Sequence, residues 1–342
     1  MVIIGLDVHR DYTQIEQLAE EGESRSRRIR TERGSLVRYF GAMPRSRILL
    51  ESSTESEWVA RILEELGHEV IVADPNFAPM YLERVRRVKT DRRDAQALAQ
   101  ACRLGAYRPA HRLSEEGRRL RGRLRVRQAL VRSRSQFIVL TRSLLRQEGI
   151  RVRSGSAPTF AQRVKEIELP AELGSVVEPL LSMFGELNER IASADRDLDR
   201  LARRDPLVRR LCTAPGVGPV TAAEFVSTID RADRFGSAKQ VRSYLGLVPR
   251  ESSSAERRWR GRITRRGNER LRSLLVEAAW GVWRSKTVEA EPLKSWAKEI
   301  AARRGKGKAM VALARRLAGI LWAIWRDGTS YEAPHSQEVA AA

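Results

Sequence analysis

The chain is 342 residues long and 42% hydrophobic, which is typical of a globular protein with two or three domains. Its net charge of +21 predicts a polyanionic partner and argues against a basic one. No run of about 18 apolar residues is present, so no membrane span is predicted. The N-terminus lacks the basic start of a signal peptide, and the only cysteines, Cys102 and Cys212, lie far apart in apolar segments. We therefore expect a cytoplasmic protein with free thiols.

The positive charge is concentrated after residue 110. Residues 1–110 hold 18 basic and 17 acidic residues, whereas residues 111–342 hold 46 and 26. Each Lys or Arg that neutralises a phosphate releases a counterion, so nucleic acid is the expected partner. An anionic membrane surface is the competing partner, but the basic stretches lack the apolar face that it requires. We therefore predict that the second part of the chain binds nucleic acid and that no membrane is involved.

Residues 1–110 are predicted to form an α/β domain with a mixed sheet. Four segments have the pattern of strands, at residues 2–8, 12–20, 47–51 and 70–73. The first two are expected to pair as a hairpin. Helices are predicted over 57–66 and 91–104. Strands that alternate with helices in this way favour an α/β layered fold.

Residues 111–205 are predicted to form a long helical linker. Apolar residues seven apart indicate a helix over 114–148, and a coiled-coil seam indicates a second over 177–204. A loop rich in Ser, Gly and Pro, residues 151–170, separates them. The pair is interpreted as an antiparallel helical hairpin or an oligomerisation arm. A plain helical bundle within one domain is the alternative.

Residues 206–330 are predicted to form a mostly helical C-terminal domain. Its last two helices are expected within residues 291–326, joined by a basic turn at 303–308. The remaining residues, 331–342, are small and polar and are expected to form a flexible tail.

Four acidic residues form a candidate metal site: Asp7, Glu51, Asp91 and Asp94. Asp7 and Glu51 end two predicted buried strands, and a buried unpaired carboxylate is costly enough to suggest a function. Asp91 and Asp94 are three apart and share one helical face. Such carboxylates suit one or two Mg²⁺ ions, which support phosphodiester chemistry. Each acid alone also has an ordinary structural interpretation, as a helix cap, a partner of nearby arginines or a strand end.

Glycines in the C-terminal domain form a candidate phosphate-binding turn. Pro-Gly-Val-Gly precedes an apolar helix, and its glycines, Gly216 and Gly218, resemble those of a helix-hairpin-helix module. Backbone N–H groups beside a helix N-terminus bind phosphate well. A plain turn between two helices is the alternative.

An arginine-rich segment with a run of serines follows. Between residues 250 and 272 there are nine arginines and three acids. Seven are candidate phosphate contacts: Arg250, Arg257, Arg258, Arg260, Arg262, Arg265 and Arg266. A solvated basic loop is the alternative. The serines at 252–254 have no histidine close by in sequence, so a Ser-His-Asp hydrolase is not expected.

These motifs together resemble the transposases of the insertion-sequence-110 family. In chain order they are Gly-Leu-Asp-Val-His, Leu-Leu-Glu, Lys-Thr-Asp-Arg-Arg-Asp-Ala, Pro-Gly-Val-Gly, Gly-Leu-Val-Pro-Arg and Arg-Ile-Thr-Arg-Arg-Gly-Asn. The resemblance covers about residues 1–105 and 205–285. It implies a RuvC-like, ribonuclease H-like N-terminal domain whose four acids bind Mg²⁺. It also implies a C-terminal transposase domain with a nucleophilic serine.

The resemblance further implies the mechanism and the partners. Ser254 matches the position of the family's serine, with Ala255 where the family usually has glycine, and Ser253 is the alternative nucleophile. A covalent phosphoserine link to DNA and a structured guide RNA are implied. So is a homo-oligomer, a dimer or tetramer, in which acids and serine can come from different protomers.

Two other functions remain open from the residues themselves. A metal-dependent nuclease or junction resolvase would use water as the nucleophile and form no covalent adduct. A non-catalytic nucleic-acid-binding protein would bind DNA without the acids and without Mg²⁺.

Overall fold

The chain divides into two compact units, Met1–Leu113 and Ser114–Ala342, and each is described on its own. The structure is a computed structural model that describes residues 1–18, 24–77, 80, 90–254 and 257–333, without the side chains of residues 252–260. Among the described residues, no helix is long and apolar enough to cross a membrane.

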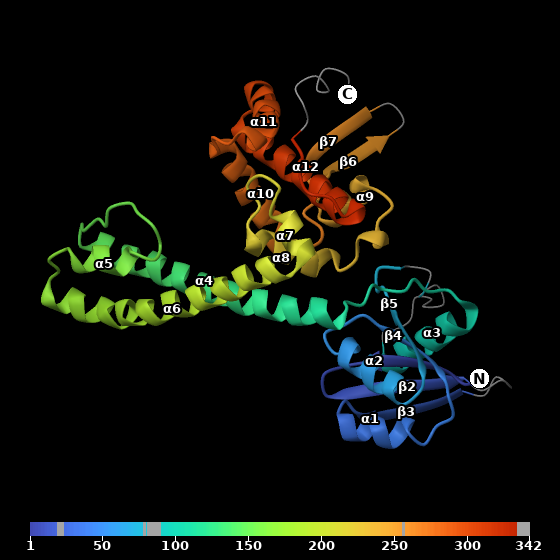
Figure 1. Ribbon diagram of the computed structural model, residues 1–342. Helices are drawn as coiled ribbons and strands as arrows, with labels where there is room; N and C mark the ends of the chain where they lie inside the picture. Colours follow the sequence, from blue (N-terminus) through green and yellow to red (C-terminus); the bar gives the residue numbers. More distant parts are fainter. Residues whose placement is uncertain (19–23, 78–79, 81–89, 255–256, 334–342) are drawn as a thin grey trace. The chain divides into compact units, whose positions relative to one another are not determined.

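A five-stranded mixed sheet forms the centre of the first unit (Figure 1). Its strands are β1 (Ile3–Val8), β2 (Tyr12–Leu18), β3 (Ser24–Arg30), β4 (Arg47–Glu51) and β5 (Glu69–Ala73). Their order is β3-β2-β1-β4-β5; β1, β2 and β3 are antiparallel, whereas β4 and β5 run parallel to β1. The predicted mixed sheet and the hairpin of its first two strands are confirmed.

Strand β3 and the following helix were not predicted from the sequence. The strand reads Ser-Arg-Ser-Arg-Arg-Ile-Arg, has no apolar alternation and is mostly exposed. Pairing with β2 alone places it at the sheet edge, where charged residues also discourage pairing with another chain. Helix α1 (Arg33–Phe40) then returns the chain to the sheet and buries Leu36 and Phe40.

Helices cover both faces of the sheet. On one face, α1 and α2 (Ser56–Glu65) pack against alternate residues of the central strands, such as Leu6 of β1 and Leu50 of β4. On the other face, α3 (Asp91–Leu104) packs Leu98 and Cys102 against Leu49. Because side chains alternate along a strand, the odd-numbered residues of β1 and β4 face α3.

Helix α3 lies unusually close to β1. A Cβ atom on Gly5 would lie 2.1 Å from the carbonyl oxygen of Ala95 and 2.3 Å from the amide nitrogen of Ala99. Thr90 begins the helix as its N-cap, with its Oγ1 accepting from the Arg93 N–H at 3.4 Å. Gly105, at φ 67°, ends it. The predicted helix over 91–104 is confirmed, and a glycine in β1 permits its close contact.

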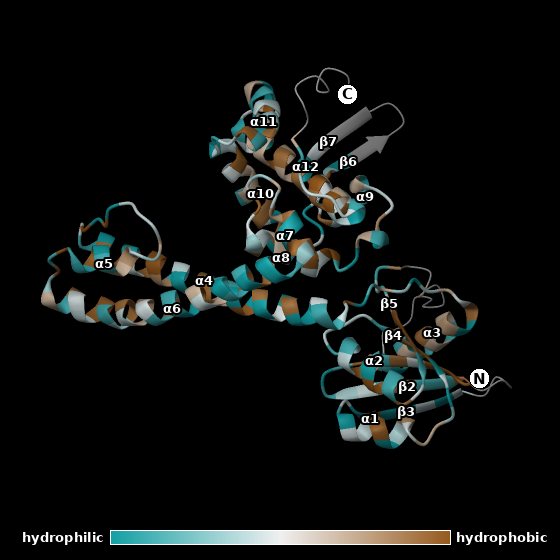
Figure 2. Ribbon diagram, in the orientation of Figure 1, coloured by the Kyte–Doolittle hydropathy of each residue, from teal (hydrophilic) through white to brown (hydrophobic). Residues whose placement is uncertain are grey.

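Two long helices form an antiparallel arm in the second unit. Helix α4 (Glu115–Gln147) packs along α6 (Ala171–Arg204), and Figure 2 shows apolar and polar residues alternating along both. The Arg127 Nε lies 2.5 Å from the Asp195 Oδ1 across the pair. Helix α6 begins six residues earlier than predicted, directly after Pro170. Its first turns bury Val177, before the coiled-coil seam starts.

The predicted loop between the long helices contains a short helix. Helix α5 (Phe160–Lys165) buries Phe160 and Val164 against Phe184 of α6. The Phe160 and Phe184 ring centroids are 5.6 Å apart. A six-residue helix is too short to show a clear period in sequence, and packing at the end of the arm stabilises it.

The rest of the second unit is a helical domain around one large core. Its helices are α7 (Pro206–Leu211), α8 (Pro219–Ile229), α9 (Ala238–Tyr244), α10 (Glu269–Arg284), α11 (Glu291–Arg304) and α12 (Lys306–Asp327). Helix α12 contacts α7, α9, α10 and α11, with Leu313, Leu317 and Leu321 fully buried. The predicted helix pair at 291–326 is confirmed, but the predicted turn at 303–308 is wrong, because only Gly305 separates the two helices.

The predicted C-terminal tail is anchored where it starts. The Tyr331 N–H donates to the Thr213 Oγ1 at 2.8 Å, and the Tyr331 ring packs against the helical core. Residues 334–342 of the predicted tail lie outside the described residues.

The arginine- and serine-rich segment is a β-hairpin rather than a loop. Strand β6 (Pro249–Ser254) pairs antiparallel with β7 (Arg257–Ile263). The two chain segments at its base touch closely, because Cβ atoms on Gly246 and Gly267 would each lie 2.1 Å from a backbone oxygen of the other segment. Both glycines have positive φ, 67° and 87°. The two strands could not be predicted from the sequence, because their residues are mostly polar and show little alternation between apolar and polar positions.

Both cysteines are free, as predicted. Burial raises the pKa of the Cys102 thiol to about 11, so the thiol stays protonated at neutral pH.

We expect Gly5→Ala to displace α3 from the sheet. The added methyl group meets backbone atoms, and overpacking of this kind costs about 1–3 kcal/mol of unfolding free energy. Hydrogen exchange of peptides from residues 91–104 should become faster, and urea should unfold the first unit at lower concentration. Gly34→Ala, where a Cβ meets nothing within 4 Å, is the matched control. Unchanged exchange in Gly5→Ala would refute the close contact.

Candidate metal centre and basic hairpin

Two of the predicted acids lie at the C-terminal ends of neighbouring parallel strands, Glu51 as the last residue of β4 and Asp7 one residue before the end of β1. Leu6 of β1 pairs in register with Leu50 of β4, and the next residues along the two strands are Asp7 and Glu51. Both are odd-numbered, so strand alternation turns them toward α3. The sequence-based placement of these two acids at one edge of the sheet is therefore supported by the register.

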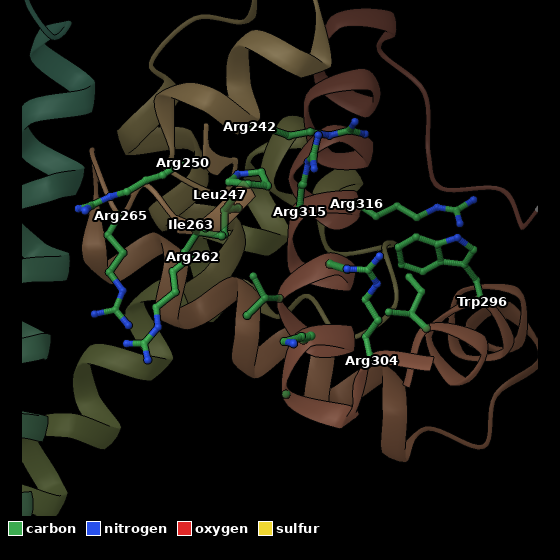
Figure 3. Close-up of a pocket in the computed structure, with 17 residues that line it drawn as sticks. Arg242, Leu247, Arg250, Arg262, Ile263, Arg265, Trp296, Arg304, Arg315 and Arg316 are labelled. Carbon is green, nitrogen blue, oxygen red and sulfur yellow. The ribbon is translucent and has the colours of Figure 1, made fainter. Parts of the chain in front are cut away.

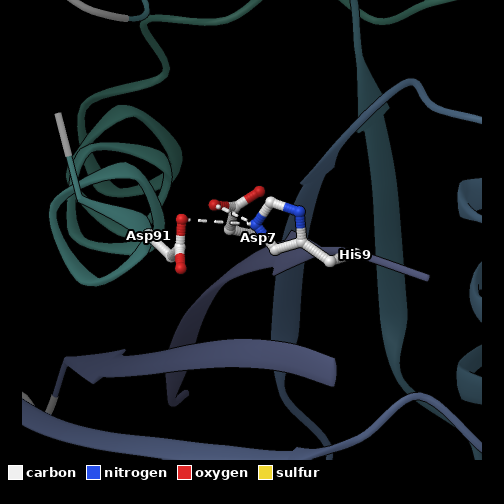
Figure 4. A group of neighbouring side chains, drawn as sticks. All are labelled: Asp7, His9 and Asp91. Atoms are coloured by element: carbon white, nitrogen blue, oxygen red, sulfur yellow. Dashed lines mark hydrogen bonds and ion pairs between the residues drawn. The ribbon is translucent and has the colours of Figure 1, made fainter. Parts of the chain in front are cut away.

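Helix α3 brings Asp91 to the same place. The His9 Nε2 lies 3.2 Å from the Asp7 Oδ2 and 3.5 Å from the Asp91 Oδ1 (Figure 4). Asp7 is 16% exposed and Asp91 33% exposed, so the cluster is shielded yet open to a ligand. An imidazole thus lies between two carboxylates from different elements.

Two residues of the antiparallel strands orient Asp91. The Tyr12 hydroxyl donates to the Asp91 Oδ2 at 2.9 Å, and an Arg28 Nη2 lies 3.4 Å from the same oxygen. The Arg28 guanidinium also stacks over the Tyr12 ring, 4.3 Å from its centroid. The other Asp91 oxygen remains directed toward His9 and Asp7.

Asp94 adds a further carboxylate one turn along α3. It is 5% exposed and is among the few buried acids of the described chain. Burial raises the pKa of Asp7, and the nearby charges of Asp94 and Asp91 raise it further, against the opposing effect of His9. Like charges held together at a partly buried position favour a bound cation.

The donor set fits a divalent metal ion. Ligand atoms of Asp7, His9 and Asp91 all lie within 4.8 Å of one another. Glu51 and Asp94 are outside this group, although the strand register and the helix turn bring them toward the same face. Carboxylate oxygens suit Mg²⁺ and Mn²⁺, and an imidazole nitrogen is accepted by the transition metals.

His9 was missed from the sequence as a member of this cluster. In the sequence, the histidines are candidates only as bases for a serine. The signal was nonetheless present: His9 follows Asp7 by two residues, and two residues along an extended chain point to the same side.

The predicted glycine turn has two different local environments. A Cβ on Gly216, at φ 77°, would lie 2.3 Å from the Ala278 carbonyl oxygen, so this glycine permits contact with α10. Gly218 is the N-cap of α8 and has nothing within 4 Å of its Cβ position. Among the described residues, close packing therefore accounts for Gly216 and not for Gly218.

The predicted serines lie along β6. Ser252, Ser253 and Ser254 pair in register with residues 259, 258 and 257 of β7. Ser254 is the last residue of the strand, and Ala255 lies outside the described residues. The backbone therefore places the candidate nucleophile at the end of a hairpin strand.

The predicted arginines divide into three groups. Arg257, Arg258 and Arg260 belong to β7, and their side chains lie outside the described residues. Three others, Arg250, Arg262 and Arg265, line one side of a groove (Figure 3). Arg266 is exposed beside them, and its carbonyl accepts from the Arg272 Nη1 at 3.0 Å.

Two family models match this chain. The model described as "Transposase IS116/IS110/IS902 family" matches residues 208–293, which include the hairpin. A second model, described as "Transposase" and representing the DEDD domain of IS110 elements, matches residues 4–149, which include all four predicted acids.

Curated relatives align over nearly the whole chain. A "Probable family 20 transposase" of Pseudomonas aeruginosa is 30% identical over 96% of this chain and 98% of its own length. The "Transposase for insertion sequence element IS1111A" of Coxiella burnetii is 27% identical, over 96% and 91%. The "Transposase for insertion sequence element IS1328" of Yersinia enterocolitica is 27% identical, over 97% and 98%.

The fold, the acidic cluster and the matches to family models and curated relatives together define a DNA transposase of a mobile element. The chain belongs to the IS116/IS110/IS902 family of transposases. The predicted family and the predicted enzyme class are confirmed.

We expect Asp7→Asn and Asp91→Asn each to weaken divalent-metal binding by about tenfold or more, because each removes a charged ligand. Electron paramagnetic resonance titration with Mn²⁺ measures the free ion directly. Asp11→Asn, an exposed acid outside the cluster, is the matched control and should bind Mn²⁺ as the wild type does. Wild-type affinity in Asp7→Asn would contradict the assignment.

Proposed function

We propose that this transposase cuts and rejoins the DNA of its element through a serine nucleophile, with Mg²⁺ held by Asp7, Glu51, Asp91 and Asp94. The observation that carries the proposal is the convergence of Asp7, His9 and Asp91 at one edge of the sheet. Family membership supports DNA as the substrate.

The residues around the metal site have distinct roles. A bound Mg²⁺ would offset the charge that develops on the phosphate oxygens. Tyr12 and Arg28 hold one oxygen of Asp91, which leaves the other directed into the cluster. Asp94 increases the negative potential at Asp7, which strengthens cation binding. His9 is placed to share the cluster or to accept a proton.

Ser254 is the proposed nucleophile and Ser253 the alternative. In the proposed step the serine Oγ forms a bond to the phosphorus while the bond from phosphorus to one deoxyribose oxygen breaks. The serine proton leaves to a base, and the departing oxygen takes up a proton. The phosphoserine link conserves the phosphodiester bond energy, so rejoining to another strand needs no nucleotide cofactor. Position at the end of β6 and the family resemblance support this assignment.

The partners follow from charge and resemblance. The predicted phosphate contacts include Gly216, Gly218 and the arginines of the 250–266 segment, in the part of the chain that carries nearly all of the net positive charge. We propose that they hold element-end and target DNA and a structured guide RNA, and that the protein acts as a homo-oligomer.

A covalent trapping assay tests this function. The protein is incubated with element-end DNA, the element's noncoding RNA and Mg²⁺, then denatured and resolved for protein–DNA adducts. Ser254→Ala and Asp7→Ala should each reduce the adduct by about 10³-fold or more, because nucleophile and metal ligand act as one unit. Ser253→Ala is the matched control and should retain it.

Cleavage without an adduct, unchanged in Ser254→Ala, would contradict the serine mechanism and indicate a nuclease that uses water. Adduct formation lost in Ser253→Ala and kept in Ser254→Ala would assign the nucleophile to Ser253. Mixing the Asp7→Ala and Ser254→Ala proteins tests the oligomer, since restored activity requires acids and serine from different protomers.

A further inference from the structure

A basic groove runs between the base of the β6–β7 hairpin and helices α11 and α12 (Figure 3). Its volume is about 1560 Å³. The described residues that line it include seven arginines and one lysine and no acid. A cavity with one sign of charge concentrates counterions of the opposite sign, so its ligand is an anion.

Three arginines that line the groove, Arg242, Arg315 and Arg316, lie close enough for their charges to interact. Burial lowers the pKa of Arg242, and the charges of Arg315 and Arg316 lower it further. The Nε atoms of Arg242 and Arg315 are buried and have no hydrogen-bond partner among the described residues. The Arg242 guanidinium packs so tightly over Gly319 that a Cβ there would lie 2.4 Å from its Nη2. Positive charge is therefore concentrated in this part of the groove, which favours an anionic ligand.

The groove also has an apolar surface, which a purely phosphate-binding site does not need. Trp296 and Ile300 of α11 and Val311 of α12 line it together with the charged residues. The Arg316 guanidinium stacks over the Trp296 ring, 4.7 Å from its centroid. Aromatic rings and guanidinium planes are the groups on which unpaired bases stack.

The groove is continuous with the hairpin that carries the serines. Pro249 and Arg250 of β6 and Arg262 of β7 line its near side, and Arg265 lies two residues after the end of β7. Arg265 has a φ of 57°, an uncommon conformation for a residue with a side chain. Its N–H donates to the Gly246 carbonyl at 3.1 Å, which holds that conformation.

We propose that this groove binds a single-stranded segment of the DNA substrate, with its phosphates on the arginines and a base against Trp296. The inference rests on the proposed function in taking DNA at the hairpin. A duplex presents phosphates and groove edges but keeps its base faces stacked, so it would leave the apolar wall unused. An unpaired strand uses both the charge and the aromatic surface.

Fluorescence anisotropy tests the proposal on the full-length Ser254→Ala protein in EDTA, so that binding is measured without reaction. Probes are a labelled single-stranded DNA, its duplex and the matching single-stranded RNA. Trp296→Leu should weaken binding of single-stranded DNA by about tenfold and leave duplex binding nearly unchanged. Arg304→Gln and Arg316→Gln should each reduce the slope of log affinity against log salt by about 0.7.

Matched controls come from α10 and α11 of the same helical domain. Trp283 packs against the same core and Arg303 precedes Arg304, and neither lines the groove. Trp283→Leu and Arg303→Gln should therefore bind as the parent protein does. Trp296→Tyr retains a ring and should recover most of the affinity, which separates loss of stacking from loss of folding.

Equal losses in Trp296→Leu and Trp283→Leu, or equal losses for duplex and single strand, would overturn the proposal. A loss confined to RNA would do the same. Binding is measured on the Ser254→Ala protein, which forms no covalent adduct. A negative binding result would therefore contradict the groove proposal and not the serine mechanism. Absence of an adduct with the wild-type protein would contradict the serine mechanism and not the groove proposal.

Discussion

The close contact of helix α3 with strand β1 is the constraint on which the candidate metal site depends. Asp7 is fixed by the strand and Asp91 by the first turn of the helix, so their separation is set by how near the two backbones approach. Gly5 permits that approach, since any side chain there would meet the backbone of α3. A glycine at this one position of the strand thus allows two carboxylates that are more than eighty residues apart in sequence to lie close together.

The two units concentrate charge of opposite sign. The first holds similar numbers of basic and acidic residues but gathers Asp7, Asp91 and Asp94 at one partly buried position. The second carries most of the positive charge and gathers arginines, such as Arg242 and Arg315, with donors that lack a partner among the described residues. Each arrangement costs folding free energy, which binding of a cation or of a phosphate would recover.

Strong local signals made much of this architecture predictable. The apolar strands that carry Asp7 and Glu51 near their ends, and the helix that starts after Thr90, follow from alternation and capping. Those same elements carry the four predicted acids. His9 was missed because a side chain two residues along a strand was not counted with Asp7.

Other elements depend on tertiary contacts that a sequence pattern does not contain. Strand β3 is polar and forms only because β2 pairs with it. The β6–β7 hairpin reads as a solvated basic loop, yet close backbone contact at Gly246 and Gly267 fixes its base. Helix α5 is held by Phe160 in the core of the arm. In each case the structure is determined by the segment that packs against the element, and not by the spacing of apolar residues within it.

The most direct test of the convergent site is electron spin-echo envelope modulation of the Mn²⁺-loaded protein with ¹⁵N-labelled histidine. Mn²⁺ bound among Asp7, His9 and Asp91 should show a ¹⁵N coupling from one directly bound imidazole, and His9→Gln should abolish it while Mn²⁺ remains bound. Bound Mn²⁺ with no histidine coupling, or a coupling that persists in His9→Gln, would contradict the convergence of these three residues on one metal ion.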